Sequence, residues 1–125
     1  MKHISKHLPA FIAILLPALL LAQSARELYD GANKMEQEAD KQLNAAYQRL
    51  LKSIDHEGRP NADLAIERLR ESQKAWLKYR DAQVAFVATY ADIGSSSARA
   101  AGSASYSVEL TKQRIKDFEN VPNPF

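Results

Sequence analysis

The sequence predicts an all-α protein: an antiparallel three-helix arrangement with two long helices and one shorter C-terminal helix. Three observations lead to this prediction. Apolar residues recur at steps of three and four along most of the chain. Residues 61–92 contain neither Gly nor Pro. The chain also has no cysteine, so a small core must be held by packing and by polar pairing.

Residues 1–24 have the features of a secretory signal peptide. A basic start is followed by an uncharged apolar run of 14 residues, 8–21, in which Pro17 should end the helix. Small residues follow this run: Ala22, Ser24 and Ala25. Cleavage after Ala22 or Ser24 is expected. Since the run is shorter than the roughly 20 residues that span a bilayer, we expect a periplasmic or secreted protein with no stable membrane anchor.

Charge and composition exclude several function classes. The chain has 17 Lys and Arg against 15 Asp and Glu, but Lys2 and Lys6 lie in the signal segment. The remainder carries 15 of each, so its neutrality argues against nucleic-acid binding. His56 is the only histidine after the signal segment, which argues against a His-based metal site or a His-dependent nucleophile. No cofactor is indicated.

The first helix is expected from about Glu27 to about Ile54. One face of it is apolar and steps by three and four, through Leu28, Ala32, Met35, Ala39, Leu43, Ala46, Leu50 and Ile54. Gly58 and Pro60 should end this segment, and Asn61 can cap the next helix.

The second helix is expected to run from residue 61 to about Ala91, with Leu64 and Trp76 among its apolar residues. Residues 93–105 are small and polar and are expected to form an exposed loop. Ser103 or Ser105 could then cap a third helix over about 106–119. Residues 25–119 are therefore taken as one helical domain, and residues 120–125 as an extended tail.

Polar residues occur on helix faces that are otherwise apolar. Gln73, Trp76 and Arg80 share a face of the second helix, and Asp40, Asn44 and Tyr47 lie at helical spacing on the first. Buried polar groups need partners, so Asp40 is expected to pair with Arg80 or Arg114, and Asn44 with Gln73 or a backbone group. The predicted polar core is completed by Asp81, Thr111 and Arg114.

The same residues carry a resemblance to a known family. The motifs are Ala39-Asp40-x-x-Leu43-Asn44-x-x-Tyr47, Gln73-x-x-Trp76-x-x-Tyr79-Arg80-Asp81 and Leu110-Thr111-x-x-Arg114. Their order resembles the lysozyme inhibitor LprI-like N-terminal domain family, small exported bacterial helical proteins, over residues 27–118. Members commonly carry cysteines where this chain has positions near Gly31, Val84 and Tyr106, so the resemblance implies that Val84 and Tyr106 pack in place of cross-links.

The resemblance implies an exported, non-enzymatic binding protein that inhibits a lysozyme-type muramidase. The cleft of such an enzyme holds two carboxylates, which a small loop bearing a cation could fill. The candidate partner-binding loop is Gly94, Ser95, Ser96, Ser97 and Arg99.

The alternative is a structural or protein-interaction module of the envelope with an unknown target. Tyr29, Phe86 and Tyr90 are candidates for its contact surface. An enzyme acting on cell-wall glycan is a third interpretation, which lacks a convincing acid–base pair. The sequence does not indicate an oligomeric state.

Overall fold

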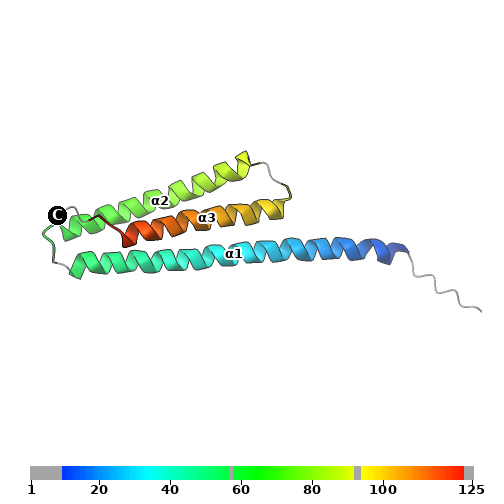
Figure 1. Ribbon diagram of the computed structural model, residues 1–125, viewed down its shortest axis with the longest axis horizontal. Coiled ribbons are helices and arrows are strands. Elements are labelled where there is room, and N and C mark those ends of the chain that lie inside the picture. Colours follow the sequence, from blue (N-terminus) through cyan, green and yellow to red (C-terminus); the bar gives the residue numbers. More distant parts are fainter. Residues whose placement is uncertain (1–9, 57, 92–93, 123–125) are drawn as a thin grey trace, which may run out of the picture.

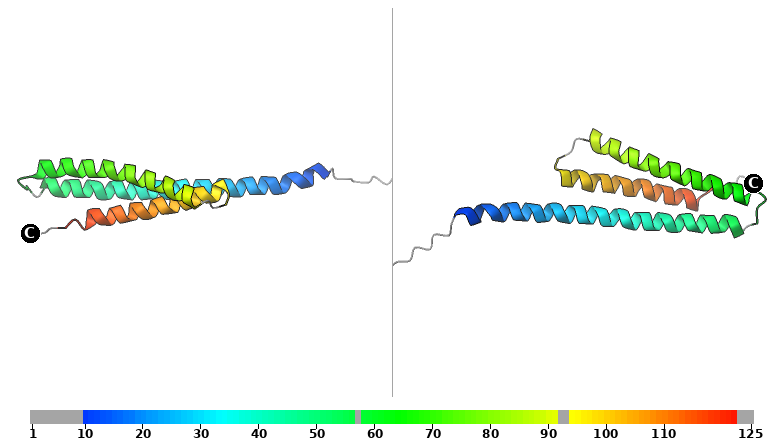
Figure 2. Two further views of the ribbon diagram at one scale, coloured as in Figure 1. Left: turned by 90° about the horizontal axis from the view of Figure 1, so that it is seen from above. Right: turned by 180° about the vertical axis from the view of Figure 1, so that it is seen from behind.

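Three helices make up the fold. The computed structural model describes residues 10–56, 58–91 and 94–122, with side chains from residue 20 onward. The helices are α1 (Ala10–His56), α2 (Ala62–Tyr90) and α3 (Ser96–Glu119), so the all-α prediction is confirmed. α2 runs back along α1, and α3 then returns in the direction of α1 (Figures 1 and 2).

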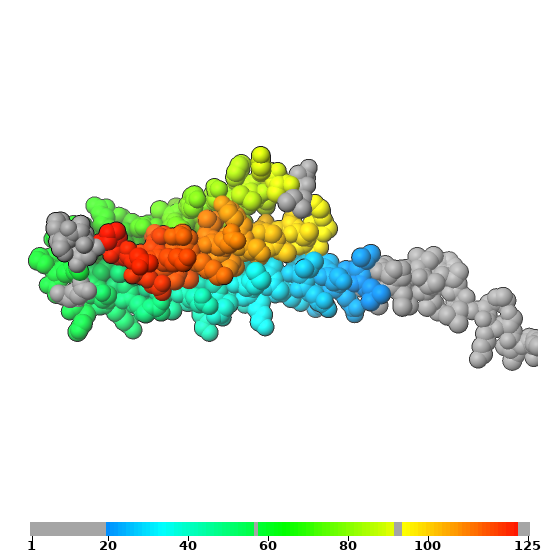
Figure 3. Space-filling view, viewed as in Figure 1, coloured from blue at the N-terminus to red at the C-terminus, as the bar shows by residue number. Residues whose placement is uncertain are grey.

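The N-terminal part of α1 differs from the prediction. The helix begins at Ala10 and continues through Pro17, where a break was expected. Proline removes a single backbone hydrogen bond, and helix-forming residues on both sides maintain the geometry here. Figure 1 shows the start of α1, in blue, projecting beyond α2 and α3. Leu20 and Leu21 are 60% and 73% exposed, and Figure 3 shows α1 from residue 20 onward, in blue, extending past the other two helices. Residues 1–9, the basic start expected for a signal peptide, lie outside the described residues.

A membrane-spanning helix is not found in the described part of the chain: none of its helices combines the necessary length and apolar character.

α3 is longer than predicted, because the small, polar stretch expected to be a loop is helical from Ser96 onward. The helix begins at the N-cap Ser95, whose Oγ accepts a hydrogen bond from the backbone N–H of Ala98 at 3.3 Å. Ser103 and Ser105, the predicted caps, lie inside the helix. Ser97 and Ala104 are buried, so the stretch is helical because its small side chains face another helix.

That other helix is α1, which shares its most extensive contact with α3. Buried residues recur every seven positions on both helices. On α1 they are Ala32, Ala39 and Ala46. On α3 they are Ser97, Ala104, Thr111 and Phe118. A seven-residue repeat is typical of coiled-coil packing, and small side chains allow two helix backbones to lie close together.

α2 packs less tightly than the other two helices. It has no fully buried residue, although Leu69 and Trp76 pack on the core cluster of Leu43, Ala46 and Phe118. Figure 2 shows α2 diverging from α1 toward its C-terminal end. The part of α1 beside the diverging end of α2 therefore has fewer neighbours. Leu28 and Met35, which were predicted on the apolar face of the first helix, are both 46% exposed, and Leu64 in the first turn of α2 is 51% exposed.

The two connections turn at glycines. Gly58 and Gly94 have φ of +57° and +61°, values that residues with a Cβ rarely adopt. Asn61 occupies the N-cap position of α2 as predicted, but its side chain makes no capping hydrogen bond. The N–H of Ala62 instead donates to the carbonyl of Arg59 at 3.1 Å.

Candidate functional site

Asp40, Arg80 and Thr111 meet at the centre of the bundle, one from each helix. Arg80 Nη1 donates to Asp40 Oδ1 at 2.5 Å and to Thr111 Oγ1 at 3.0 Å. Thr111 is 1% exposed, and its hydroxyl in turn donates to the carbonyl of Ser107 at 2.8 Å. Of the two partners foreseen for Asp40, Arg80 is the one present. The pair is asymmetric, because the Arg80 side chain is 12% exposed and that of Asp40 is 50% exposed.

Arg114 forms a second polar group along the same seam. Its Nε donates to Gln73 Oε1 at 3.2 Å and its Nη2 to Ser72 Oγ at 2.8 Å. Burial lowers the pKa of the Arg114 guanidinium, although Asp117 opposes this effect. Asn44 was expected to bond Gln73 or a backbone group. Gln73 instead accepts from Arg114 of α3, and the Asn44 side chain is exposed, so its placement in the polar core is wrong. Sequence reasoning also missed Ser72, one turn of helix before Trp76.

Trp76 lies between the two arginines. The Cζ atoms of Arg80 and Arg114 are 5.3 Å and 5.8 Å from its ring centroid, within the range of cation–π attraction. Arg114 also lies 4.6 Å from the ring of Phe118, which contacts Tyr47 with centroids 5.8 Å apart. The aromatic residues therefore contribute to holding both cations inside the bundle.

The positions at which the resemblance leads us to expect cysteine hold other residues. Val84 is partly buried, and the hydroxyl of partly buried Tyr106 accepts a hydrogen bond from Gln83 Nε2 at 3.3 Å. Both side chains therefore pack, as the resemblance implies. Gly31 is exposed, with open space where a Cβ would stand.

A groove of about 510 Å³ adjoins the Asp40–Arg80 pair between the three helices. Carboxylates from Glu36, Asp40 and Asp81 line it, and Asp81 is 77% exposed. The buried Nε of Arg80 has no hydrogen-bond partner in the described part of the chain, and Asp81 Oδ1 lies 3.7 Å from it. His56 is the last residue of α1, 16 residues or about 24 Å of helix beyond Asp40. It is therefore too far away to act as a general base together with these carboxylates.

No metal site is found in residues 10–56, 58–91 and 94–122: three or more His, Asp or Glu side chains do not come together there in a way that could hold a metal ion. The arrangement at the bundle centre fixes the positions of charges.

The candidate partner-binding residues lie at one end of the bundle, where α2 ends and α3 begins (Figure 1). Gly94 and Ser95 form the turn, Ser96 starts the helix, and Ser97 is buried with its Oγ 3.0 Å from that of Ser95. Arg99 is exposed on the first turn of α3. The expectation of an exposed loop is therefore wrong from Ser96 onward, because these residues belong to a capped helix, whereas Gly94 and Ser95 precede it.

The comparison with known families bears on the whole helical region. A family model described as lysozyme inhibitor LprI matches residues 21–118. The chain belongs to this LprI family. The match includes all three motifs of the polar seam, so the resemblance read from those motifs is confirmed. No curated protein and no solved structure shows a significant match to the chain.

Proposed function

We propose that this LprI family member is an exported, non-enzymatic binding protein that inhibits a lysozyme-type muramidase. The observation that carries the proposal is the family match over residues 21–118, because the family's description names lysozyme inhibition. An all-helical chain whose central polar residues are engaged with one another suits a binding role better than acid–base catalysis. Export to the periplasm or the medium is part of this proposal.

The surface that we propose for the contact is the α2–α3 corner, defined by Phe86, Tyr90 and Arg99. Phe86 and Tyr90 are 58% and 80% exposed, and their rings stack with centroids 5.8 Å apart. Aromatic residues and arginine are the types enriched at binding hot spots. The guanidinium of Arg99 can donate to cleft carboxylates, and its position on a capped helix lowers the entropy lost on binding.

An inhibition assay tests both the activity and the surface. The purified protein is added to several types of lysozyme, and lysis of a cell-wall suspension is followed. Arg99→Ala and Tyr90→Ala should each weaken inhibition by about tenfold. The matched controls are Arg70→Ala and Tyr79→Ala, which change exposed residues elsewhere on α2 and should leave inhibition unchanged.

Two outcomes would count against these assignments in different ways. No inhibition of any lysozyme type at about 10 μM, well above typical interface affinities, would discard the inhibitor function. Inhibition that is unchanged in both corner variants would retain the function but exclude this surface.

The second candidate function is an envelope protein-interaction module with another target. α2 has no fully buried residue, and five of its large apolar residues are exposed: Leu64, Leu77, Tyr79, Phe86 and Tyr90. This exposed apolar surface favours the second candidate. If the partner is a second copy of the chain, a solution dimer should be lost in Phe86→Asp without loss of helical content. A monomer at all concentrations would exclude self-association.

A further inference from the structure

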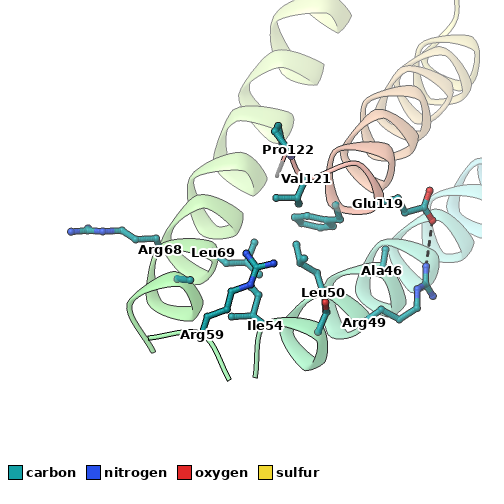
Figure 4. Close-up of a pocket in the computed structure, with 13 residues that line it drawn as sticks. Ala46, Arg49, Leu50, Ile54, Arg59, Arg68, Leu69, Glu119, Val121 and Pro122 are labelled. Carbon is teal, nitrogen blue, oxygen red and sulfur yellow. Dashed lines mark hydrogen bonds and ion pairs between the residues drawn. The ribbon is translucent and has the colours of Figure 1, made fainter. Parts of the chain in front are cut away.

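A pocket of about 730 Å³ lies at the other end of the bundle, where α1 ends, α2 begins and α3 ends (Figure 4). Its interior is mainly apolar and draws on all three helices and on the segment after α3: Leu50, Ile54, Leu69, Phe118 and Val121. Pockets that hold small molecules are commonly 300–1,000 Å³ in volume, apolar inside, and edged by a few polar groups. This pocket has that composition, and nothing in the proposed inhibitor function uses it.

The polar groups at its edge are mostly cationic. Arg49, Arg59 and Arg68 line the pocket, against the single carboxylate of Glu119. Glu119 lies 3.5 Å from Arg49 Nη2 at one side of the opening. Arg68 points away from the pocket in Figure 4, and it pairs with Glu71 at 2.8 Å.

Arg59 is the cation best placed to meet a ligand. It lies in the connection between α1 and α2, and Figure 4 shows its guanidinium between Leu69 of α2 and Leu50 of α1, among the residues that line the pocket. A guanidinium has five N–H donors in a planar fork, so it can bind an anionic oxygen in addition to groups of the protein. The excess of cations at the opening favours a ligand with an anionic head.

We propose that this pocket binds a small amphipathic anion, an apolar chain or ring that ends in one carboxylate or phosphate group. The apolar part lies against Leu50, Leu69 and Phe118, where it displaces water from carbon surface. The anionic head stays at the opening, where Arg59 donates to it. A neutral or cationic head on the same apolar body lacks this contact.

Calorimetric titration of the purified full chain with dodecanoate, below its micellar concentration, tests the proposal. Dodecanoate should bind saturably at one site. Dodecyltrimethylammonium, which has the same tail and a cationic head, should bind at least about tenfold more weakly, because it loses a charged hydrogen bond. Acetate, a head without a tail, should show no binding. Dodecyl phosphate in place of dodecanoate distinguishes a phosphate head from a carboxylate head.

Matched substitutions locate the site. Arg59→Gln should weaken dodecanoate binding by about tenfold, whereas Arg70→Gln, at an exposed α2 position outside the pocket lining, should change it less than about twofold. Ala65→Phe fills the pocket from an exposed lining position and should abolish binding. Ala75→Phe places the same ring on an exposed α2 position away from the pocket and should leave dodecanoate binding intact. Thermal melts of each variant verify that the fold is retained.

Three results would overturn the proposal. The first is equal affinity for the anionic and cationic tails. The second is dodecanoate binding that is unchanged in both Arg59→Gln and Ala65→Phe. The third combines two observations: dodecanoate does not bind saturably, and the Ala65→Phe protein still cosediments with phosphatidylglycerol vesicles. That result would assign the affinity to a lipid surface and not to the pocket.

Discussion

Arg80 contacts several partners from one buried position. It bonds a carboxylate on α1 and a hydroxyl on α3, and its guanidinium lies near the ring of Trp76. A buried cation is costly unless it is paired, and here the cost is met by contacts from all three helices. Because Asp40 is half exposed, water screens its share of the pairing. The contribution of Arg80 to stability therefore exceeds that of its acidic partner.

Replacing this cation should destabilise the bundle. Arg80→Ala should lower the free energy of unfolding by about 2–3 kcal/mol, because it removes two charged hydrogen bonds and leaves Thr111 without its cationic donor. Lys78→Ala, at an exposed position on the same helix, should stay within about 0.5 kcal/mol. Urea denaturation of both variants checks this, and equal losses would contradict a buried role for Arg80.

The contact between α1 and α3 depends on small residues. Alanines on α1 face serine, alanine and threonine on α3 at heptad spacing, so the helices lie closer than leucine side chains would allow. The polar residues Ser97 and Thr111 are buried in this contact with hydrogen-bonding partners. α2 covers only part of the pair, which leaves Tyr79, Phe86 and Tyr90 exposed and available for binding.

Enlarging one of these alanines tests the close approach. Ala46 is 2% exposed, so Ala46→Leu should destabilise the protein by about 1–3 kcal/mol through overpacking. Its neighbour Ala45 is exposed on the same helix, and Ala45→Leu should change stability by less than about 0.5 kcal/mol. Thermal unfolding of the two variants measures the difference. Similar melting temperatures would show that the α1–α3 contact tolerates large side chains.

The beginning of α3 is tested by its cap. Ser95→Ala removes the oxygen that accepts from Ala98 and should cost about 1 kcal/mol. Hydrogen exchange should then accelerate in the first turn of α3. Ser105→Ala, at an exposed position within the helix, should be neutral or slightly stabilising because alanine is the better helix former. The opposite ranking would indicate that the helix begins near residue 105.

The molecule as a whole is a compact bundle with an extension. Residues 20–24 of α1 are all exposed, including two leucines. Exposed leucines in a segment that packs against nothing described contribute little to folding. This agrees with the cleavage expected after Ala22 or Ser24, after which α1 would begin close to the level at which α3 begins (Figure 1).

Removal of residues 1–24 should therefore leave stability unchanged. A chain that begins at Ala25 should unfold within about 0.5 kcal/mol of the full chain, because the loss involves exposed side chains alone among residues 20–24. Matched urea titrations of the two chains provide the measurement. A clear loss would show that the extension packs on the bundle. Intact-mass analysis of exported protein would locate the cut after Ala22 or Ser24.

Local pattern was sufficient to predict the helical class, the ends of α2 within one residue, and the pairing of Arg80 with Asp40 as one of two alternatives. It was wrong to place Asn44 and Asp81 in the polar core, because both side chains are exposed. The features predicted correctly follow from periodicity, from Gly58, and from the rule that polar groups on an apolar face need partners. The seven-residue spacing of Ser97, Ala104, Thr111 and Phe118 was also present in the sequence. It was missed because small polar residues resemble a loop when no facing helix is known.

Partner choice and pocket formation depended on the tertiary structure. Asp40 had two candidate arginines, and only the register between α1 and α2 decided that Arg80 lies opposite it. In the same way, only the packing of α2 against α3 decided that Gln73 meets Arg114. The Ser-rich segment is helical because α1 presents alanines to it. The apolar pocket with its cationic edge exists because three helix ends converge there. Residues distant in sequence create these environments, and a pattern read along one helix does not contain them.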